Sequence, residues 1–153
     1  MIELKNISFR HENADVPSLK NISLTIADGE CVLLCGESGS GKTTITRLIN
    51  GLIPHFYEGE LEGIAMVNGL NVTEAELYET AKLVGSVFQN PRSQFFCVDT
   101  TSELAFGCEN MGMPENEVLA RVDAASAELK IENLLGRSIF ELSGGEKQKI
   151  ACA

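Results

Sequence analysis

The sequence lacks tryptophan and is poor in basic residues. It has 12 Lys and Arg against 22 Asp and Glu, which gives a formal net charge of −10. No cluster of basic residues stands out along the chain. Because nucleic-acid affinity comes largely from Lys and Arg that neutralise phosphates, this composition disfavours a general nucleic-acid-binding surface. We expect the acidic surplus to form a solvated exterior.

The sequence also lacks the patterns of a disulfide framework, a zinc site and a membrane span. Its five cysteines are odd in number and include no C-x-x-C pair. No apolar run approaches the roughly 18 residues of a spanning helix, and no signal peptide precedes the first expected strand. A reducing cytosol fits this composition. We expect any membrane association to go through a partner, and the 153 residues suit one domain.

The most informative stretch is the run GESGSGKT at residues 36–43. It matches the phosphate-binding pattern G-x-x-x-x-G-K-[ST], known as the P-loop. Its glycines allow a tight turn in which successive backbone N–H groups point at phosphate oxygens. The helix that follows adds the positive end of its dipole. Lys42 is expected to reach the outer phosphates and Thr43 to offer its hydroxyl to Mg²⁺. The alternative is a glycine-rich connection that binds nothing.

The residues around this run predict a strand, a loop and a helix, in that order. Residues 30–35 are a short apolar run typical of a buried strand, in which Cys31 and Cys35 act as small hydrophobes. Gly51 and Pro54 are expected to end the helix. Apolar residues recur at the spacing of one helix face: Ile45, Leu48, Ile49 and Leu52.

Other segments of the first 90 residues have the periodicity of strands. Turns are expected at Asp28-Gly29 and Asn68-Gly69. A short helix is expected over residues 73–77, capped by Thr73, and a second apolar strand over residues 83–88. The expected half-buried strands are residues 3–9, 19–26 and 60–67.

After Pro91 the pattern becomes helical. Residues 99–111 predict one helix, and Pro114 is expected at the first helical position of another that runs from about 115 to 130. A second motif, LSGGEKQ, occupies residues 142–148. Its serine and glutamate form a capping box, and its two glycines leave the N–H groups of a helix start open to an anion. Taken alone, this motif also fits an ordinary capped helix.

Three motifs together resemble the ATP-binding cassette (ABC) family: GESGSGKT, LSGGEKQ, and the glutamine that ends Val87-Phe88-Gln89. The resemblance covers essentially the whole chain. It implies an α/β fold, in which a P-loop NTPase core carries an N-terminal antiparallel β subdomain and an inserted α-helical subdomain. The implied parts are an antiparallel β region over 1–29, part of the P-loop core over 30–90, the helical subdomain over 91–142, and the signature motif with the start of its helix over 142–153.

The same resemblance implies a role for each motif. Lys42 and Gln89 are the implied catalytic residues, and Thr43 and Gln89 are the implied ligands of Mg²⁺. The alternative for Gln89 is a polar residue that ends a strand. The residues implied to hold ATP in the loop are Gly36, Glu37, Ser38, Gly39, Ser40, Gly41, Lys42, Thr43 and Thr44. The signature residues, implied to contact the ATP of a second subunit, are Ser143, Gly144, Gly145 and Glu146.

Two further positions carry open alternatives. His11 stands where the family usually has an aromatic residue that stacks on adenine; an imidazole can stack, and the alternative is a solvated loop histidine. Residues 88–96 are similar to the Q-loop region of energy-coupling-factor (ECF) importers, which take up vitamins and transition-metal ions. Phe95 and Phe96 are therefore either a contact for a transmembrane coupling helix or core packing of the helical subdomain.

The chain reaches Ala153 before the Walker B strand, the D-loop and the switch histidine of the family pattern. Hydrolysis needs a group that orients or deprotonates the attacking water. We therefore expect residues 1–153 to bind ATP weakly and barely hydrolyse it. We also expect an unprotected sheet edge, and with it marginal stability or non-native association.

The implied function is that of the ATP-binding subunit of an ECF-like importer, which couples ATP binding and hydrolysis to the transport of a vitamin or metal ion. The implied partners are a second ABC ATPase domain, arranged head to tail in a homo- or heterodimer, and a transmembrane subunit, with no nucleic acid. The implied location is the cytoplasmic face of the membrane. The alternative is a soluble ABC-class ATPase that acts on DNA or ribosomes. An unrelated P-loop kinase or GTPase fails to explain LSGGEKQ.

Overall fold

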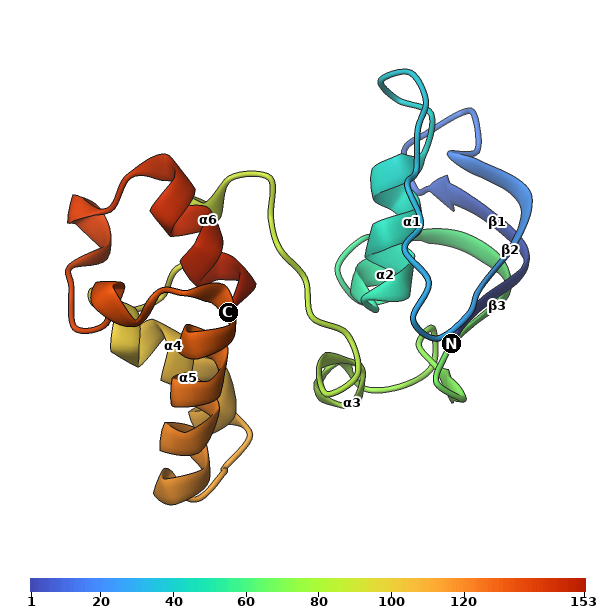
Figure 1. Ribbon diagram of the computed structural model, residues 1–153. Helices are drawn as coiled ribbons and strands as arrows, with labels where there is room; N and C mark the ends of the chain where they lie inside the picture. The colour runs from blue at the N-terminus through green and yellow to red at the C-terminus, as the bar shows by residue number, and fades with distance from the viewer. The chain divides into compact units, whose positions relative to one another are not determined.

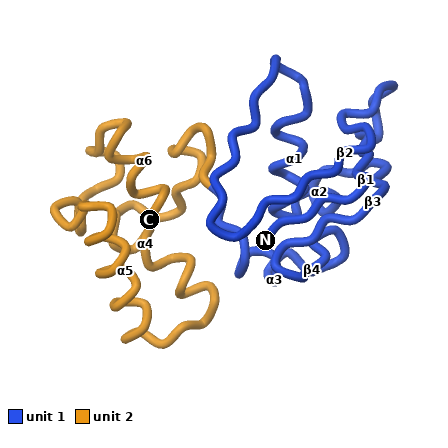
Figure 2. Tube along the Cα trace, turned by 45° about the vertical axis from the view of Figure 1, so that its right-hand side comes forward, with its two compact units in different colours: residues 1–86 blue, residues 87–153 orange.

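The computed structural model describes residues 1–153, which form two compact units. Residues 1–86 make up the first unit and residues 87–153 the second (Figure 2). Each unit has its own buried apolar residues. No helix combines the length and the apolar character that crossing a membrane requires.

The first unit is built on a four-stranded antiparallel sheet with the strand order β2-β1-β3-β4 (Figure 1). The long central strand β1 pairs Ile2 with Ile26 on one side and with Val67 on the other. Asn68 and Gly69 both have positive φ and form the two-residue turn between β3 and β4. The strands are β1 (Ile2–His11), β2 (Leu19–Ile26), β3 (Gly59–Val67) and β4 (Leu70–Asn71). The three strands expected from alternation in this region, and the Asn68-Gly69 turn, are confirmed.

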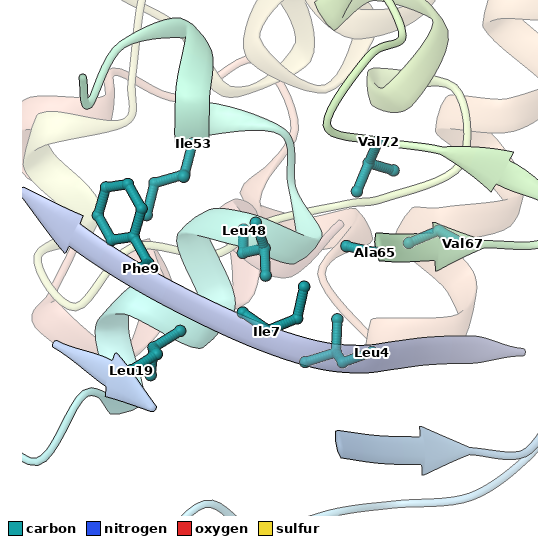
Figure 3. Packing of buried hydrophobic residues seen from close by; sticks show 9 residues of the cluster. All are labelled: Leu4, Ile7, Phe9, Leu19, Leu48, Ile53, Ala65, Val67 and Val72. Carbon is teal, nitrogen blue, oxygen red and sulfur yellow. The ribbon is translucent and has the colours of Figure 1, made fainter. Parts of the chain in front are cut away.

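Two helices cover one face of this sheet: α1 (Lys42–Ile49) and α2 (Leu52–His55). Leu48 of α1 and Ile53 of α2 are fully buried and point toward the apolar side chains of β1 (Figure 3). Burial of each such side chain contributes roughly 1.5–3 kcal/mol. The predicted helix after the glycine-rich loop is confirmed, and it ends before Gly51. The core residues are Leu4, Ile7, Phe9, Leu19, Leu48, Ile53, Ala65, Val67 and Val72.

The two predicted apolar core strands are wrong for this chain. Residues 30–35 and 83–88 are extended but belong to no strand. Leu33 is 84% exposed, and Cys31 and Cys35 are exposed rather than packed as small hydrophobes. A buried strand needs hydrogen-bonded neighbours, because unpaired backbone groups are costly away from water. Neither segment has such a neighbour among residues 1–153.

The short helix predicted over residues 73–77 is displaced along the chain. Residues 72–74 form a turn, in which the Thr73 hydroxyl donates to Asn71 Oδ1 at 2.9 Å. The helix is α3 (Leu77–Ala81), and its N-cap is Glu76. A capping box is present, but it joins Glu76 and Glu79 rather than Thr73 and Glu76. Thr73 does not cap, because residues 72–74 form a turn and the helix begins four residues further on, at Leu77.

The second unit is helical, as the pattern after Pro91 predicts. Asp99 caps α4, as its side chain accepts a hydrogen bond from Ser102 N at 3.0 Å. Pro114 is the N-cap of α5, one position earlier than predicted, because its ψ of 144° is extended. The elements are η1 (Pro91–Ser93), α4 (Thr100–Asn110), α5 (Glu115–Leu129), η2 (Glu132–Leu134), η3 (Ile139–Glu141) and α6 (Gly144–Cys152).

Two small apolar clusters hold these helices together. One joins Val118 and Val122 of α5 to Ala105 of α4. The other gathers residues around α6, with Phe95 packed against it: Ile131, Leu134, Leu142 and Ile150. The helix expected from about 115 to 130 is therefore α5, and Val118 and Val122 lie on its buried face. The second cluster fixes α6, which carries the second glycine motif.

Candidate functional site

The glycine-rich run forms an exposed loop that leads into α1, drawn in cyan above that helix in Figure 1. Within the loop, only Ser40 N donates a backbone hydrogen bond, to Glu37 O at 3.2 Å. The N–H groups of residues 36–39 and 41–44 donate to no group of the chain. Gly41, the N-cap of α1, has no side chain to cover the helix start. The loop therefore presents a set of free donors, together with the positive end of the helix dipole.

Glycine is required at Gly41 for two reasons. Its φ is 90°, and a Cβ built there would lie 2.8 Å from Ser18 O and 2.9 Å from Leu19 Cδ2. The start of α1 therefore packs directly on the start of β2. Gly39 also has a positive φ, of 83°, but nothing lies within 4 Å of its Cβ position. That open space leaves room for a ligand against the loop backbone.

The Lys42 side chain folds back over the loop. Its ammonium Nζ donates to Gly36 O at 2.9 Å, to Glu37 O at 2.7 Å and to Ser40 Oγ at 3.3 Å. A single positive charge thus sits among the free N–H groups. This arrangement suits an anion with several oxygens, which exchanges some of these bonds for bonds to its own oxygens.

The remaining loop residues divide between surface and core. Glu37, Ser38 and Thr43 are exposed, whereas Thr44 is buried under the loop. The Thr43 carbonyl accepts from the Thr46 hydroxyl at 3.0 Å, and the Thr43 hydroxyl is exposed. No group of three or more His, Cys, Asp and Glu gathers to hold a metal ion by itself.

His11 is half-buried and lies among aromatic side chains. Its ring meets Phe9 edge-on at a centroid distance of 4.7 Å, and Tyr57 at 6.5 Å. The Arg47 guanidinium stacks over Tyr57 at 4.0 Å. A surface hollow is lined by His11 and its neighbours Arg10, Glu12 and Glu58–Glu60. Tyr57 was not singled out from the sequence, because only the fold brings it beside His11.

The second glycine motif starts helix α6 as predicted. Ser143 Oγ accepts from Glu146 N at 3.3 Å, and Ser143 N donates to Glu146 Oε2 at 2.7 Å. Hydrogen bonds to Ser143 lower the pKa of Glu146, helped by Arg137 at 3.8 Å. The N–H groups of Gly144 and Gly145 donate to no group of the chain, and nothing fills the space at either Cβ position. This helix start can also accept an anion.

Gln89 is exposed and makes no hydrogen bond, whereas its neighbour Gln94 is fully engaged. Gln94 Oε1 accepts from Phe88 N at 2.9 Å, and Gln94 Nε2 donates to Ala151 O of α6 at 3.2 Å. Gln94 thus joins the backbone next to Gln89 to the last turn of α6. Sequence reasoning missed this role, since nothing in the spacing of the two segments indicates the contact.

The sequence left two alternatives for Phe95 and Phe96, a partner contact or core packing, and the structure places the two side chains differently. Phe95 is half-buried against the apolar cluster under α6. Phe96 is 76% exposed and stacks on Phe106 at 4.9 Å. Core packing is therefore the answer for Phe95, and Phe96 lies on the surface.

A family model described as "ABC transporter" matches residues 19–153. The chain belongs to the ABC transporter family. A Treponema denticola protein named as an ABC transporter ATP-binding protein is 58% identical over all 153 residues, which span 31% of its length. A Pyrococcus abyssi protein of the same name is 41% identical, and the chain spans 55% of it. The chain thus covers from about a third to about half of these relatives.

Solved structures of ABC proteins share the fold. Clostridium perfringens cbiO1, described as part of the ABC transporter complex cbiONQ, superposes with a TM-score of 0.85 at 26% identity, over 99% of this chain and 59% of that one. The ATP-binding cassette MJ0796, in a dimeric post-hydrolysis state with ADP and Pi, gives a TM-score of 0.77 at 24% identity, over 99% and 67%. The α/β ABC ATPase fold expected from the motifs is confirmed.

In this ABC-family chain the predicted site residues fall in two sets. Residues 36–44 and His11 belong to the first unit, whereas Gln89 and residues 143–146 belong to the second. Each set presents free N–H groups at a helix start. The shared Mg²⁺ ligation by Thr43 and Gln89 stays a prediction, as do the roles of the individual residues in ATP binding.

Proposed function

We propose that residues 36–44 bind the triphosphate of ATP. One observation carries this proposal. The loop at the start of α1 has backbone N–H groups that donate no hydrogen bond within the chain, and the Lys42 ammonium folds back over the same loop. ATP supplies the oxygen-rich anion that these donors lack, and Mg²⁺ neutralises part of its charge when bound. Thr43 offers the hydroxyl for that metal, and His11, beside Tyr57, is the proposed contact for adenine.

The whole protein acts in this proposal as the ATP-binding subunit of an ECF-like importer. The likeness to cbiO1, part of a transporter complex, supports this choice, as does the Q-loop segment over residues 88–96. In a head-to-tail dimer, Ser143, Gly144 and Gly145 reach the ATP held by a second cassette. A transmembrane subunit holds the protein at the cytoplasmic face of the membrane. The cargo is a vitamin or a metal ion.

Substitution of Lys42 tests nucleotide binding. K42M removes the ammonium and keeps the side-chain length, so we expect ATP affinity to fall at least tenfold, the equivalent of about 1.4 kcal/mol. K20M is the matched control, because Lys20 is exposed on β2 and has no ion-pair partner. Titration calorimetry with Mg-ATP measures the ATP affinity of K42M and of K20M. Equal affinity of K42M and K20M contradicts the proposal.

The importer assignment has its own test. The full-length protein is expressed with its transmembrane subunit and purified in detergent. Co-purification of that subunit supports the importer. Co-purification of nucleic acid or ribosomes in its place supports the soluble alternative, against which the net charge of −10 argues.

A further inference from the structure

Asparagine is followed directly by glycine at two places in the chain, Asn50-Gly51 and Asn68-Gly69. This dipeptide carries a reaction of its own, since the backbone nitrogen of the glycine can attack the side-chain amide carbon of the asparagine. Such an attack within one chain is fast where the reacting atoms are free to meet in the right orientation. Glycine hinders the approach least, because it has no Cβ. The structure treats the two dipeptides differently.

The atoms that react are open at Asn68-Gly69. The two residues form the exposed turn between β3 and β4. Gly69 N donates no hydrogen bond within the chain, and nothing lies within 4 Å of the Cβ position of Gly69. The Asn68 side chain uses only its oxygen, which accepts from Met1 N. A hydrogen bond to that oxygen favours attack at the adjoining carbon, because it stabilises the negative charge that develops on the oxygen.

The corresponding atoms are occupied at Asn50-Gly51. Asn50 Nδ2 donates to Ser86 Oγ at 3.3 Å, and Asn50 Oδ1 accepts from Leu52 N at 3.3 Å. Gly51 N donates to Leu48 O at 3.1 Å, and Gly51 is buried. Both ends of the side-chain amide and the attacking nitrogen are therefore held in other bonds.

We propose that Asn68 is a site of spontaneous deamidation and that the fold protects Asn50 from the same reaction. Gly69 N gives its proton to a base in the solvent and forms a bond to Asn68 Cγ. The bond from Cγ to Nδ2 breaks, and the amide nitrogen takes up a proton and leaves as ammonia. Water then opens the resulting succinimide ring at either carbonyl carbon, which leaves aspartate or isoaspartate. The reaction consumes water and needs no oxidant or reductant.

The two products affect the sheet differently. Aspartate keeps the backbone as it is, and Asp-Gly suits this type of turn as well as Asn-Gly does. Isoaspartate routes the backbone through the former side chain and so adds a methylene group to the turn. The pairing of Val67 with Leu70 and the burial of Val72 just beyond it both follow from a two-residue turn. Isoaspartate should therefore weaken the pairing of β4 with β3.

Peptide mapping of aged protein tests the site. The full-length protein is incubated at mildly alkaline pH, and mass spectrometry follows the conversion of amide to acid in both Asn-Gly peptides. We expect Asn68 to convert at least about tenfold faster than Asn50, which corresponds to a barrier lower by about 1.4 kcal/mol. Equal rates at the two positions, or no conversion at Asn68, overturn the inference.

The same incubation in guanidinium chloride separates the effect of the fold from that of the local sequence. Unfolding removes the hydrogen bonds of both dipeptides, so we expect the rate at Asn50 to rise close to the rate at Asn68. If Asn50 stays protected in the unfolded chain, its sequence neighbours set the difference, and the inference fails.

The variant N68D is the matched control for the effect on the sheet, because it carries the aspartate product without the added methylene group. Val72 N donates to Ala65 O at 3.0 Å, so hydrogen exchange at Val72 reports on the segment that follows β4. We expect the isoaspartate fraction of aged protein to exchange faster there than N68D. Equal exchange in the two proteins contradicts the predicted effect on β4.

Discussion

Gly41 shows at the scale of one residue how sequence and fold constrain each other. Its positive φ and its contact with the Ser18 carbonyl both exclude a side chain. The pattern G-x-x-x-x-G-K-[ST] requires glycine here, and the structure adds the reason: the loop, α1 and β2 meet at this point. Gly39 shares the conformation but not the contact.

We expect G41A to weaken ATP binding and to destabilise the protein more than G39A. G39A carries only the cost of a left-handed conformation, roughly 1–2 kcal/mol in the free energy of unfolding. G41A adds a Cβ that overlaps Ser18 O, so the loop must shift. Urea unfolding and Mg-ATP titration of the two variants measure the difference. Equal losses of stability and of ATP affinity in G41A and G39A would show that the close approach of Gly41 to Ser18 O has no effect.

Other residues of the site were beyond prediction. The loop residues follow from a motif whose members are adjacent in the chain. Tyr57 and Gln94 matter through neighbours that only the fold provides.

At the scale of elements, α4 depends on a single carboxylate. Asp99 accepts from Ser102 N at the helix start, and this hydrogen bonding lowers the pKa of Asp99 below its ordinary value of 3.8. The ionised form is therefore the one that stabilises the helix. Its contribution is complete above the ordinary pKa and is lost as the pH falls through the lowered value.

We expect D99A to reduce the free energy of unfolding by about 1 kcal/mol at pH 7. D99N, which keeps a capping oxygen, should lose less. The difference between wild type and D99A should shrink as the pH falls below 3.8, because the carboxyl becomes protonated in both folded and unfolded protein. Chemical denaturation of the three proteins across this range measures it. A difference that grows in acid contradicts the assigned cap.

Elements defined by local chemistry were predicted best. The strands β1, β2 and β3, and the helices α1, α4, α5 and α6, follow from alternation, helical spacing and caps, and all are present. Residues 30–35 and 83–88 were mispredicted because a continuous apolar run shows that a segment suits a core, not that strands pair with it. No strand among residues 1–153 pairs with either segment.

At the scale of the whole molecule, the two units have separate cores. Leu48 is fully buried in the first unit and Ile150 is buried in the second. A unit with a small core has a small free energy of unfolding, because stability is a small difference between large opposing terms. A substitution in either core should act first on its own unit.

We expect L48A and I150A each to cost about 2–5 kcal/mol in the unit that holds the residue. Native-state hydrogen exchange distinguishes the units. L48A should reduce protection along β1, and I150A should reduce it along α5 and α6. Uniform loss of protection across residues 1–153 in either variant would show instead that the two cores unfold together.

The open backbone of residues 30–35 carries two thiols, Cys31 and Cys35, both reachable from water. They act as built-in reporters of whether this segment has found a place in a sheet. While it stays unpaired, both sulfurs react freely with an alkylating reagent. Once another strand pairs with this segment, whether from a longer polypeptide or from a second molecule, and the segment packs into a core, the same sulfurs become shielded. The rate of alkylation of the two cysteines then measures assembly of the core without any engineered probe.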